Sequence, residues 1–313
     1  MQAISEPKLI PRRFQPRTSP DPRHWTLLIL ICMLAISAVG LYGSALYFVY
    51  TASHHRVVKL LHTPAELGLK GESVDLVSSD GIPLKGWWIP AEPARGAVLV
   101  LHGMDGLDAS CLLPHAKFLV PAGWSTFVLD MRAHGRSGGD RIGFSLDEPR
   151  DVSAALYWLD TQPSLKGKPL VLLGLSMGGA TAISTAAMHH NVDALISVSS
   201  FASFEPMMGQ GLQLWASRLA MLTLFHVWPL HAQPVDHIAQ ISPRPVLIMH
   251  GTADKQVPVQ DAFLLKQAGG PAVELWIAKD ADHLVFDMDG SSDSPEDVAY
   301  RTHVLQFLEK IKH

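Results

Sequence analysis

Short apolar runs recur along the chain after residue 96, and they constrain the fold more than any other feature of this sequence. Helix-length stretches of mixed polarity separate most of them. Strands that are apolar on both faces belong inside a parallel sheet, and the intervening helices supply the crossover connections. The runs are residues 97–101, 126–129, 170–173, 194–198, 246–249 and 273–277. We therefore expect a doubly wound α/β fold with a mostly parallel sheet.

Two further segments complete this domain, which we expect to span residues 73–313. Residues 73–90 contain two β-rich stretches around the turn residues Ser79-Asp80-Gly81, and this pattern predicts an antiparallel hairpin at the start. The insert between the runs 194–198 and 246–249 is strongly apolar and has no strand-like pattern. We expect it to form a small helical cap, about residues 201–242, over the carboxyl edge of the sheet.

The segment from Trp25 to Tyr50 contains no charged residue. As a helix rising 1.5 Å per residue it is long enough to cross a hydrocarbon core of about 30 Å. We therefore predict a single transmembrane anchor at residues 25–50. Two alternatives are a buried helix of a soluble domain and a signal peptide cleaved near Gly43-Ser44-Ala45. The apolar run is longer than the 7–15 residues typical of a signal peptide.

The flanks of this segment differ in charge and predict its orientation. Residues 1–24 are rich in proline and carry Lys8, Arg12, Arg13, Arg17 and Arg23, so we expect a disordered basic tail. The first stretch of residues 51–72, the expected connecting segment, holds fewer basic residues, Arg56 and Lys59. Because basic flanks stay in the cytoplasm, we expect a cytoplasmic N-terminus and a catalytic domain outside, which in a bacterium is the periplasm.

Composition argues against several classes of function. The net charge is −4, which gives no electrostatic basis for binding nucleic acid. Cys32 lies in the apolar segment and leaves Cys111 alone, so no internal disulfide is expected in the domain. Cysteines and histidines do not cluster at the short spacings of a zinc site. We expect neither a metal nor an organic cofactor.

Residues 174–178 read G-L-S-M-G and fit the G-x-S-x-G pattern of a nucleophile elbow. The run 170–173 leads into the pattern as a strand, and small residues follow it as the start of a helix. A tight strand-to-helix turn exposes the serine hydroxyl, and the flanking glycines relieve backbone crowding. The spacing therefore predicts Ser176 as a nucleophile.

A serine hydroxyl needs a base, and in this type of fold the chain order is serine, acid, histidine. His283 follows the last predicted strand in a polar loop, and Asp254 follows the strand 246–249 on the same edge as Ser176. Asp280 and Asp282 are alternative acids, but they are too close in sequence to orient the ring easily. We predict Asp254 as the acid and His283 as the base.

The alkoxide of a tetrahedral intermediate needs preorganised N–H donors. One would come from Met177, directly after the nucleophile, and the other from Met104 in the loop after the strand 97–101. The loop 132–137 follows another strand end, and we expect it to close the wall of the site, with His134 in a structural role.

In this order, the segments HGMDG, DMRAHGRS, GLSMGG, HGTADKQVP and DADH resemble the α/β-hydrolase superfamily. They are most similar to its Bem46-like and serine-aminopeptidase-like members, many of which carry an N-terminal anchor. The resemblance implies the triad Ser176, Asp254 and His283, with oxyanion amides from Met104 and Met177. Many relatives have Asn or Gly where Met104 stands, which leaves the backbone donor in place but alters the pocket.

These features together predict a serine hydrolase that cleaves a carboxylic ester through an acyl-enzyme intermediate. The apolar insert and the anchor favour a lipid-like or acyl ester over other small molecules, although the same side chains would serve to pack the cap onto the sheet. The alternatives are a peptidase or thioesterase with the same triad, and a non-catalytic membrane-bound scaffold.

Overall fold

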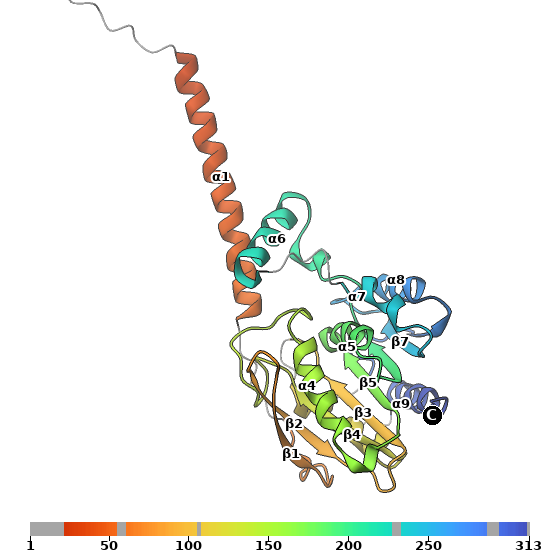
Figure 1. The fold of residues 1–313 in the computed structure, drawn as a ribbon. Coiled ribbons are helices and arrows are strands. Elements are labelled where there is room, and N and C mark those ends of the chain that lie inside the picture. The colour runs from red at the N-terminus through yellow and green to blue at the C-terminus, as the bar shows by residue number, and fades with distance from the viewer. Residues whose placement is uncertain (1–21, 55–60, 105–107, 227–232, 287–293, 312–313) are drawn as a thin grey trace, which may run out of the picture.

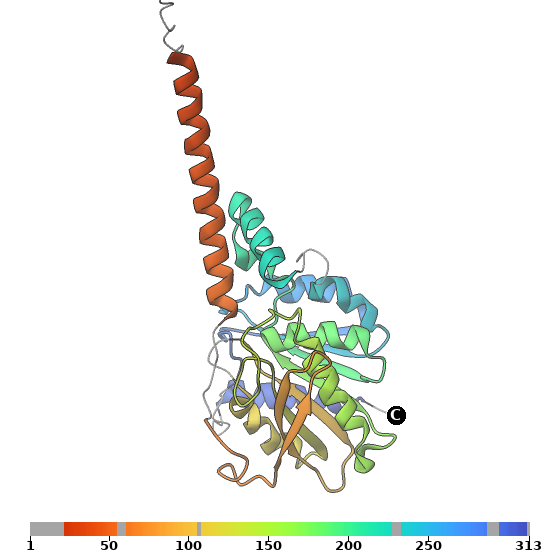
Figure 2. The same cartoon turned by 60° about the vertical axis from the view of Figure 1, so that its left-hand side comes forward.

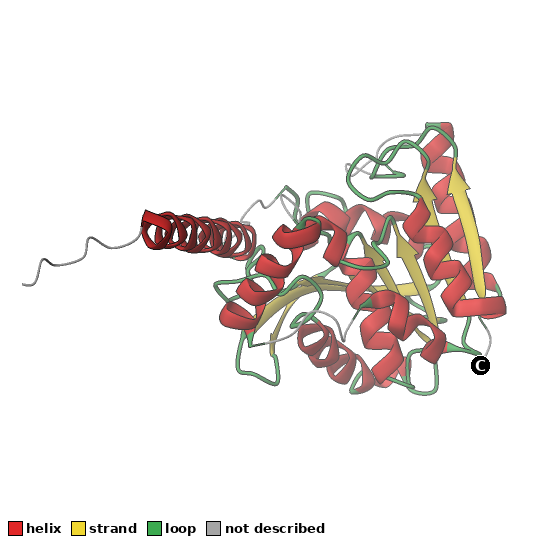
Figure 3. Cartoon of the chain, turned by 90° about the horizontal axis from the view of Figure 1, so that it is seen from above, coloured by secondary structure: helices red, strands yellow, loops and turns green. Residues whose placement is uncertain are grey.

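The computed structural model describes residues 22–54, 61–104, 108–226, 233–286 and 294–311, and it contains one sheet with helices on both faces (Figures 1 and 3). The sheet order is β1-β2-β4-β3-β5-β6-β7-β8. β1 pairs antiparallel with β2 and β2 antiparallel with β4, whereas the later pairs are parallel. The strands are β1 (Glu72–Val77), β2 (Pro83–Ile89), β3 (Gly96–Leu101), β4 (Trp124–Asp130), β5 (Leu170–Leu175), β6 (Ala194–Val198), β7 (Val246–Gly251) and β8 (Val273–Ala278). The predicted mostly parallel sheet with an antiparallel start is confirmed.

Most strands extend beyond the apolar runs that predicted them. β5 continues through Gly174 and Leu175, and β7 continues through His250 and Gly251. Ladder hydrogen bonds join backbone groups and do not depend on side-chain polarity, so pairing continues past the last apolar residue. The two extensions carry the chain to the loops that hold the candidate catalytic residues.

The helices divide between the two faces of the sheet. α4 (Pro149–Asp160), α5 (Met177–Met188) and α8 (Gln260–Gly269) contribute to one core cluster, and α2 (Ala109–Leu112), α3 (Ala116–Leu119) and α9 (Pro295–Glu309) to the other. β3 shows the expected alternation, since Leu99 faces the first cluster while Val98 and Val100 face the second. The domain therefore has the two buried sheet faces that its continuous apolar runs predict.

The strand order reverses at β3, because β4 lies on one side of it and β5 on the other. In open α/β sheets, ligands bind outside the carboxyl ends of the strands at such a switch point. The loop after β3 carries Met104 and the turn after β5 carries Ser176. The topology thus places both residues where a ligand would be expected to bind.

α1 (Pro22–Ser53) contains the predicted anchor segment and extends beyond it at both ends. Proline is tolerated in the first helical turn, where its missing N–H has no helical partner. In the described part of the chain, α1 is the one helix long and apolar enough to cross a membrane. Most of it projects from the domain with its side chains exposed (Figure 1), which is consistent with membrane anchoring. Residues 1–21 of the predicted tail and 55–60 of the connecting segment lie outside the described residues.

The region predicted as a cap, residues 201–242, is mostly helical in its described part. It contains η3 (Glu205–Met208), α6 (Gly211–Phe225), α7 (Pro234–His237) and η5 (Ile238–Ile241). Figures 1 and 2 show α6 beside the lower part of α1, on the side of the domain from which α1 projects. The Tyr42 and Thr223 hydroxyls are hydrogen-bonded at 2.8 Å, and Ala45 and Val49 of α1 are buried.

Candidate active site

Ser176 occupies the turn between β5 and α5 in a backbone conformation that L-residues rarely adopt. Its φ is 54° and its ψ is −119°. Such a conformation costs on the order of 1–3 kcal/mol and persists only where the surroundings enforce it. The Ser176 N–H donates to the carbonyl of Val198 in β6 at 2.8 Å, which helps to hold the turn.

The two glycines of the elbow are required by close backbone approaches. A Cβ on Gly174 would lie 2.2 Å from the carbonyl oxygen of Gly178, and a Cβ on Gly178 would lie 2.4 Å from the carbonyl oxygen of Leu101. Both distances are far inside van der Waals contact. Gly174 therefore allows the turn to close tightly, and Gly178 allows the elbow to pack directly against the end of β3.

Asp254 and His283 come together at the carboxyl edge although 29 residues separate them. His283 Nδ1 lies 2.7 Å from Asp254 Oδ2, and the Gln256 and Val257 N–H groups donate to Oδ1 at 2.8 and 2.9 Å. Burial raises the pKa of Asp254, but the hydrogen bonds from His250 and His283 outweigh it and hold the pKa well below its usual range. The carboxylate is therefore ionised and able to stabilise a protonated imidazole.

Among the described contacts, neither alternative acid reaches the imidazole of His283. Asp282 accepts the backbone N–H of His283 at 2.7 Å, while Asp280 is highly exposed and uses its own N–H to reach Thr252 Oγ1. The imidazole of His283 is paired with Asp254.

His250 lies directly behind the acid and was not singled out from the sequence. Its ring is fully buried, and Nε2 lies 3.2 Å from Asp254 Oδ2 and 3.0 Å from the Val257 carbonyl oxygen. Both neighbours are acceptors, so Nε2 must carry a hydrogen. The available sequence signal was its place at the end of β7, four residues before Asp254.

The candidate oxyanion donors Met104 and Met177 line one pocket together with Ser176. In the peptide between Gly103 and Met104, the carbonyl of Gly103 lies 2.7 Å from His102 Nδ1. His102 Nε2 accepts the Met131 N–H at 3.0 Å, so Nδ1 carries the hydrogen and donates it. Because C=O and N–H point in opposite directions in a trans peptide, the Met104 N–H is turned away from His102.

His134 of the predicted wall is buried and packs against the ring of His102, with 4.5 Å between centroids. Burial lowers the pKa of His102 to about 4, which keeps that ring neutral. The packing of these two rings joins the loop after β3 to the loop 132–137.

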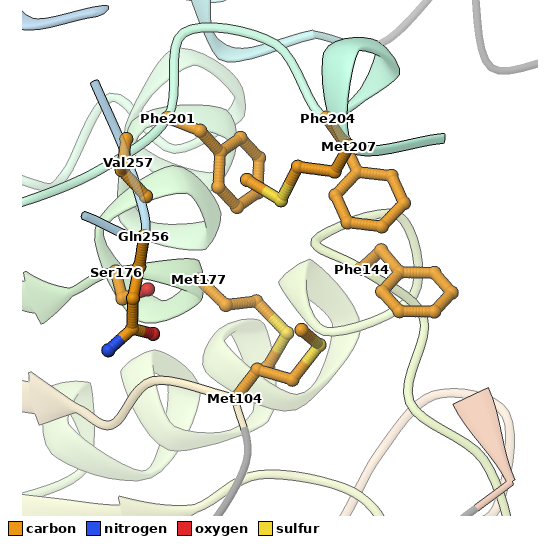
Figure 4. Close-up of a pocket in the computed structure, with 9 residues that line it drawn as sticks. All are labelled: Met104, Phe144, Ser176, Met177, Phe201, Phe204, Met207, Gln256 and Val257. Carbon is orange, nitrogen blue, oxygen red and sulfur yellow. The ribbon is translucent and has the colours of Figure 1, made fainter. Parts of the chain in front are cut away.

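The pocket above Ser176 is narrow and mostly apolar. Its cavity is about 70 Å³, and Figure 4 shows Met104 and Met177 together on one side with Phe201, Phe204 and Met207 opposite them. Phe144 stacks on Phe204 with 4.4 Å between ring centroids. Gln256 and Val257, two and three residues after Asp254 in the chain, complete the lining.

Within the described residues, no hydrogen bond joins the Ser176 hydroxyl to the His283 ring. Two observations place both residues at the same edge of the sheet. The carboxyl ends of the parallel strands β5 and β8 lie at this edge, and the loop that carries Asp254 lines the pocket of Ser176. Catalytic hydrogen bonds are often long in the absence of substrate and tighten in the complex.

Phe144 reaches the pocket from a strained loop that a buried acid holds in place. Phe144 and Ser145 have φ values of 53° and 73°. Glu148 Oε1 accepts the Gly143 N–H at 2.5 Å, and Oε2 accepts the Ser145 N–H at 2.8 Å. Burial raises the pKa of Glu148 to about 7, so the folded protein binds this proton more tightly than the unfolded chain does.

The free energy of unfolding should therefore fall as the pH rises from about 4.5 to 7. The contribution of Glu148 to this fall is about 2–3 kcal/mol. In Glu148→Gln this pH dependence disappears. At pH 5 the variant should be less stable than the wild type, because one amide group cannot accept two N–H donors, and the gap should narrow by pH 8. Thermal unfolding of both proteins across this range measures the effect. A difference in stability between the two proteins that is the same at pH 5 and pH 8 would contradict a raised pKa of Glu148.

Comparison with known proteins gives both family and fold matches. Residues 92–235 match a family model described as serine aminopeptidase, S33. Protein YfhR of Salmonella typhi is 30% identical over 241 residues, covering 71% of this chain and 76% of YfhR. Protein bem46 of Schizosaccharomyces pombe is 27% identical over 210 residues, covering 65% and 67% of the two chains. The Saccharomyces cerevisiae membrane protein YNL320W is 28% identical over 177 residues, covering 56% and 61%.

A solved structure extends the likeness to most of the domain. The Pyrococcus furiosus esterase Pf2001 matches with a TM-score of 0.66 at 23% identity, covering 82% of this chain and 97% of the esterase. At that level of identity the match concerns the fold.

Proposed function

Since this chain belongs to the α/β-hydrolase superfamily, among its Bem46-like and serine-aminopeptidase-like members, we propose that it cleaves carboxylic esters through an acyl-enzyme intermediate. The family makes it a hydrolase. The choice of a serine nucleophile and of an ester rests on the site. The observation that carries it is the 2.7 Å contact between an ionised Asp254 and His283 at the sheet edge that also bears the strained elbow of Ser176.

In the proposed mechanism, Ser176 Oγ attacks the ester carbonyl carbon and its proton passes to His283 Nε2. Asp254 stabilises the resulting imidazolium through Nδ1. The Met104 and Met177 N–H groups stabilise the oxyanion. The carbon–oxygen bond to the alcohol then breaks, and the alcohol leaves with the proton from His283. Water, deprotonated by the same ring, attacks the acyl-enzyme and releases the acid.

The size of the pocket supports a short acyl group. A water-sized group needs on the order of 10–15 Å³ of cavity volume. A cavity of about 70 Å³ therefore has room for roughly five such groups. Kcat/KM should be at least tenfold higher for p-nitrophenyl butyrate than for the palmitate. Met207→Ala, which enlarges the pocket, should narrow that ratio, whereas Met188→Ala on the outside of α5 should not. Faster hydrolysis of the palmitate by the wild type would contradict the proposal.

A peptidase with the same triad is a second candidate, favoured by the serine aminopeptidase description of the matching family model. Comparing p-nitrophenyl butyrate with amino-acid p-nitroanilides separates the two activities. Turnover of the anilides alone would replace the ester proposal, and absence of turnover of esters, thioesters and anilides would favour a non-catalytic scaffold.

We also propose that α1 spans the membrane once, with the N-terminus in the cytoplasm and the domain outside. The five basic residues in residues 1–24 outnumber Arg56 and Lys59 in the first stretch after the helix, which supports this orientation. Protease added to the outer side of intact cells or spheroplasts should digest the domain. Full protection from protease until the membrane is permeabilised would reverse the orientation.

A further inference from the structure

The outward face of α6 carries large apolar side chains. Leu212 is 76% exposed, Trp215 56%, Leu219 47% and Leu222 40%. Their spacing of three or four residues places them on one side of the helix. We call these four residues the apolar face of α6.

This face differs from the outward face of a helix that meets water. The exposed positions of α9, which has the same length of 15 residues, include Glu296, Gln306 and Glu309. Arg218, the charged residue of α6, is buried, and Glu205 accepts its N–H groups at 2.9 and 3.0 Å. α6 thus carries apolar side chains on its outward side as well as on its inward side, where Met221 and Phe225 are buried, and its charged residue is paired with Glu205.

The position of α6 beside α1 indicates which environment the apolar face of α6 meets. The Tyr42–Thr223 hydrogen bond and the Leu224 carbonyl, which accepts Arg141 Nη1 at 2.9 Å, fix the C-terminal end of α6. From that end the helix rises on the side toward which α1 projects (Figures 1 and 2). At 32 residues α1 is about 48 Å long, which exceeds the hydrocarbon core by more than ten ångströms.

We propose that the apolar face of α6 is a lipid-docking surface that enters the membrane leaflet nearest the domain, beside α1. Helices of this kind lie in the interface with their apolar side about 5–10 Å deep, and tryptophan favours that depth. The face has no charge of its own, so the proposed partner is the acyl-chain boundary of a bilayer.

Docking would also define the substrate, on the premise that the proposed ester hydrolase activity is correct. Phe204 and Met207 line the pocket and lie just before α6 in the chain, so the pocket neighbours the docked helix. A substrate residing in the bilayer would reach Ser176 from the docked side. Together with the small pocket, this points to a short acyl ester of a membrane-resident amphiphilic alcohol.

Docking is tested on the full chain in phosphatidylcholine nanodiscs, without reference to activity. Leu219→Cys is labelled with a nitrobenzoxadiazole dye in a Cys32→Ser background, where Cys111 is buried. Lipids with a doxyl group high on the acyl chain should lower its emission at least twofold. The matched control is Tyr157→Cys on α4, which is 64% exposed on another part of the domain and should not be quenched.

Equal and weak quenching at both positions would overturn the proposal. Energy transfer between labelled copies without lipid quenching would also overturn it, because a second copy of the chain would then cover the face.

The substrate is tested with two fluorogenic esters in the same discs. One is soluble 4-methylumbelliferyl butyrate, and the other is the butyrate of a hexadecyl-substituted methylumbelliferone embedded in the lipid. In Leu212→Gln/Leu219→Gln, turnover of the embedded ester should fall about tenfold while that of the soluble ester stays within twofold. Tyr157→Gln should change neither. Equal loss on both esters would contradict docking-dependent delivery. If the wild type hydrolyses neither ester, the ester hydrolase proposal fails, and the quenching result still decides whether α6 docks.

Discussion

Ser176→Ala should lower kcat for p-nitrophenyl butyrate by about 10⁴- to 10⁶-fold and abolish labelling by a fluorophosphonate probe. The size of the effect follows from chemistry, because the alanine variant cannot form the acyl-enzyme and retains only the binding and oxyanion contributions. Removing the side chain leaves the strained turn at φ 54° in place, so folding should be little changed. Gel fluorescence after labelling and steady-state kinetics measure the two losses.

The control for this experiment is another serine near the pocket. Ser203 is half-buried in the cap region, and its hydroxyl donates to Gln233 Oε1 at 3.1 Å. Ser203→Ala should keep both labelling and turnover within about twofold. If Ser176→Ala still reacts with the probe, the nucleophile lies elsewhere and the proposed mechanism is wrong.

Asp254→Asn should lower kcat by about 10⁴-fold without unfolding the protein. The carboxylate accepts from backbone N–H groups through Oδ1 and from His283 Nδ1 and His250 Nε2 through Oδ2. An asparagine that keeps its oxygen at the Oδ1 position turns its NH₂ group toward the two rings. His283 would then carry its hydrogen on Nε2 and could not accept the proton of Ser176, which is the loss expected of a wrong tautomer.

Asp282→Asn provides the comparison, because Asp282 binds only the backbone N–H of His283 in the described contacts. It should lower kcat less than tenfold. Kinetics at the pH optimum, with circular dichroism to compare folding, distinguish the two variants. A larger loss in Asp282→Asn than in Asp254→Asn would transfer the role of the acid to Asp282.

The sheet was predictable because buried parallel strands leave a continuous apolar record, and each predicted run lies within an observed strand. The pairing of Asp254 with His283 was predicted from strand ends, and the structure brings the two side chains together. The role of His250 was not predictable in this way, since its contact with Asp254 depends on the direction of a side chain at the end of β7. The identification of the nucleophile and the oxyanion donors remains a prediction until the kinetics are measured.

The apolar insert was predicted as a cap, but composition could not separate its inward side from its outward side. Met208, Met221 and Phe225 are buried, whereas Leu212 and Trp215 are exposed. All five are large apolar or aromatic side chains, so residue type alone does not separate the two groups. Which side is buried depends on tertiary packing, including that of α6 against α1, a segment about 180 residues earlier in the chain. Contacts this distant leave no local pattern in a sequence.

The junction at Ser53 ties α1 to the loop that lines the pocket of Ser176. The Ser53 carbonyl accepts the Ile142 N–H at 2.7 Å, two residues before Phe144, and the buried side of α1 packs with the neighbouring α6. A foreign membrane helix of equal hydrophobicity, grafted at this position, would hold the protein at the bilayer yet leave one wall of the enzyme unsupported. Any exchange that preserves the enzyme must therefore keep the side of the helix formed by Tyr42, Ala45 and Val49 and replace only the remainder.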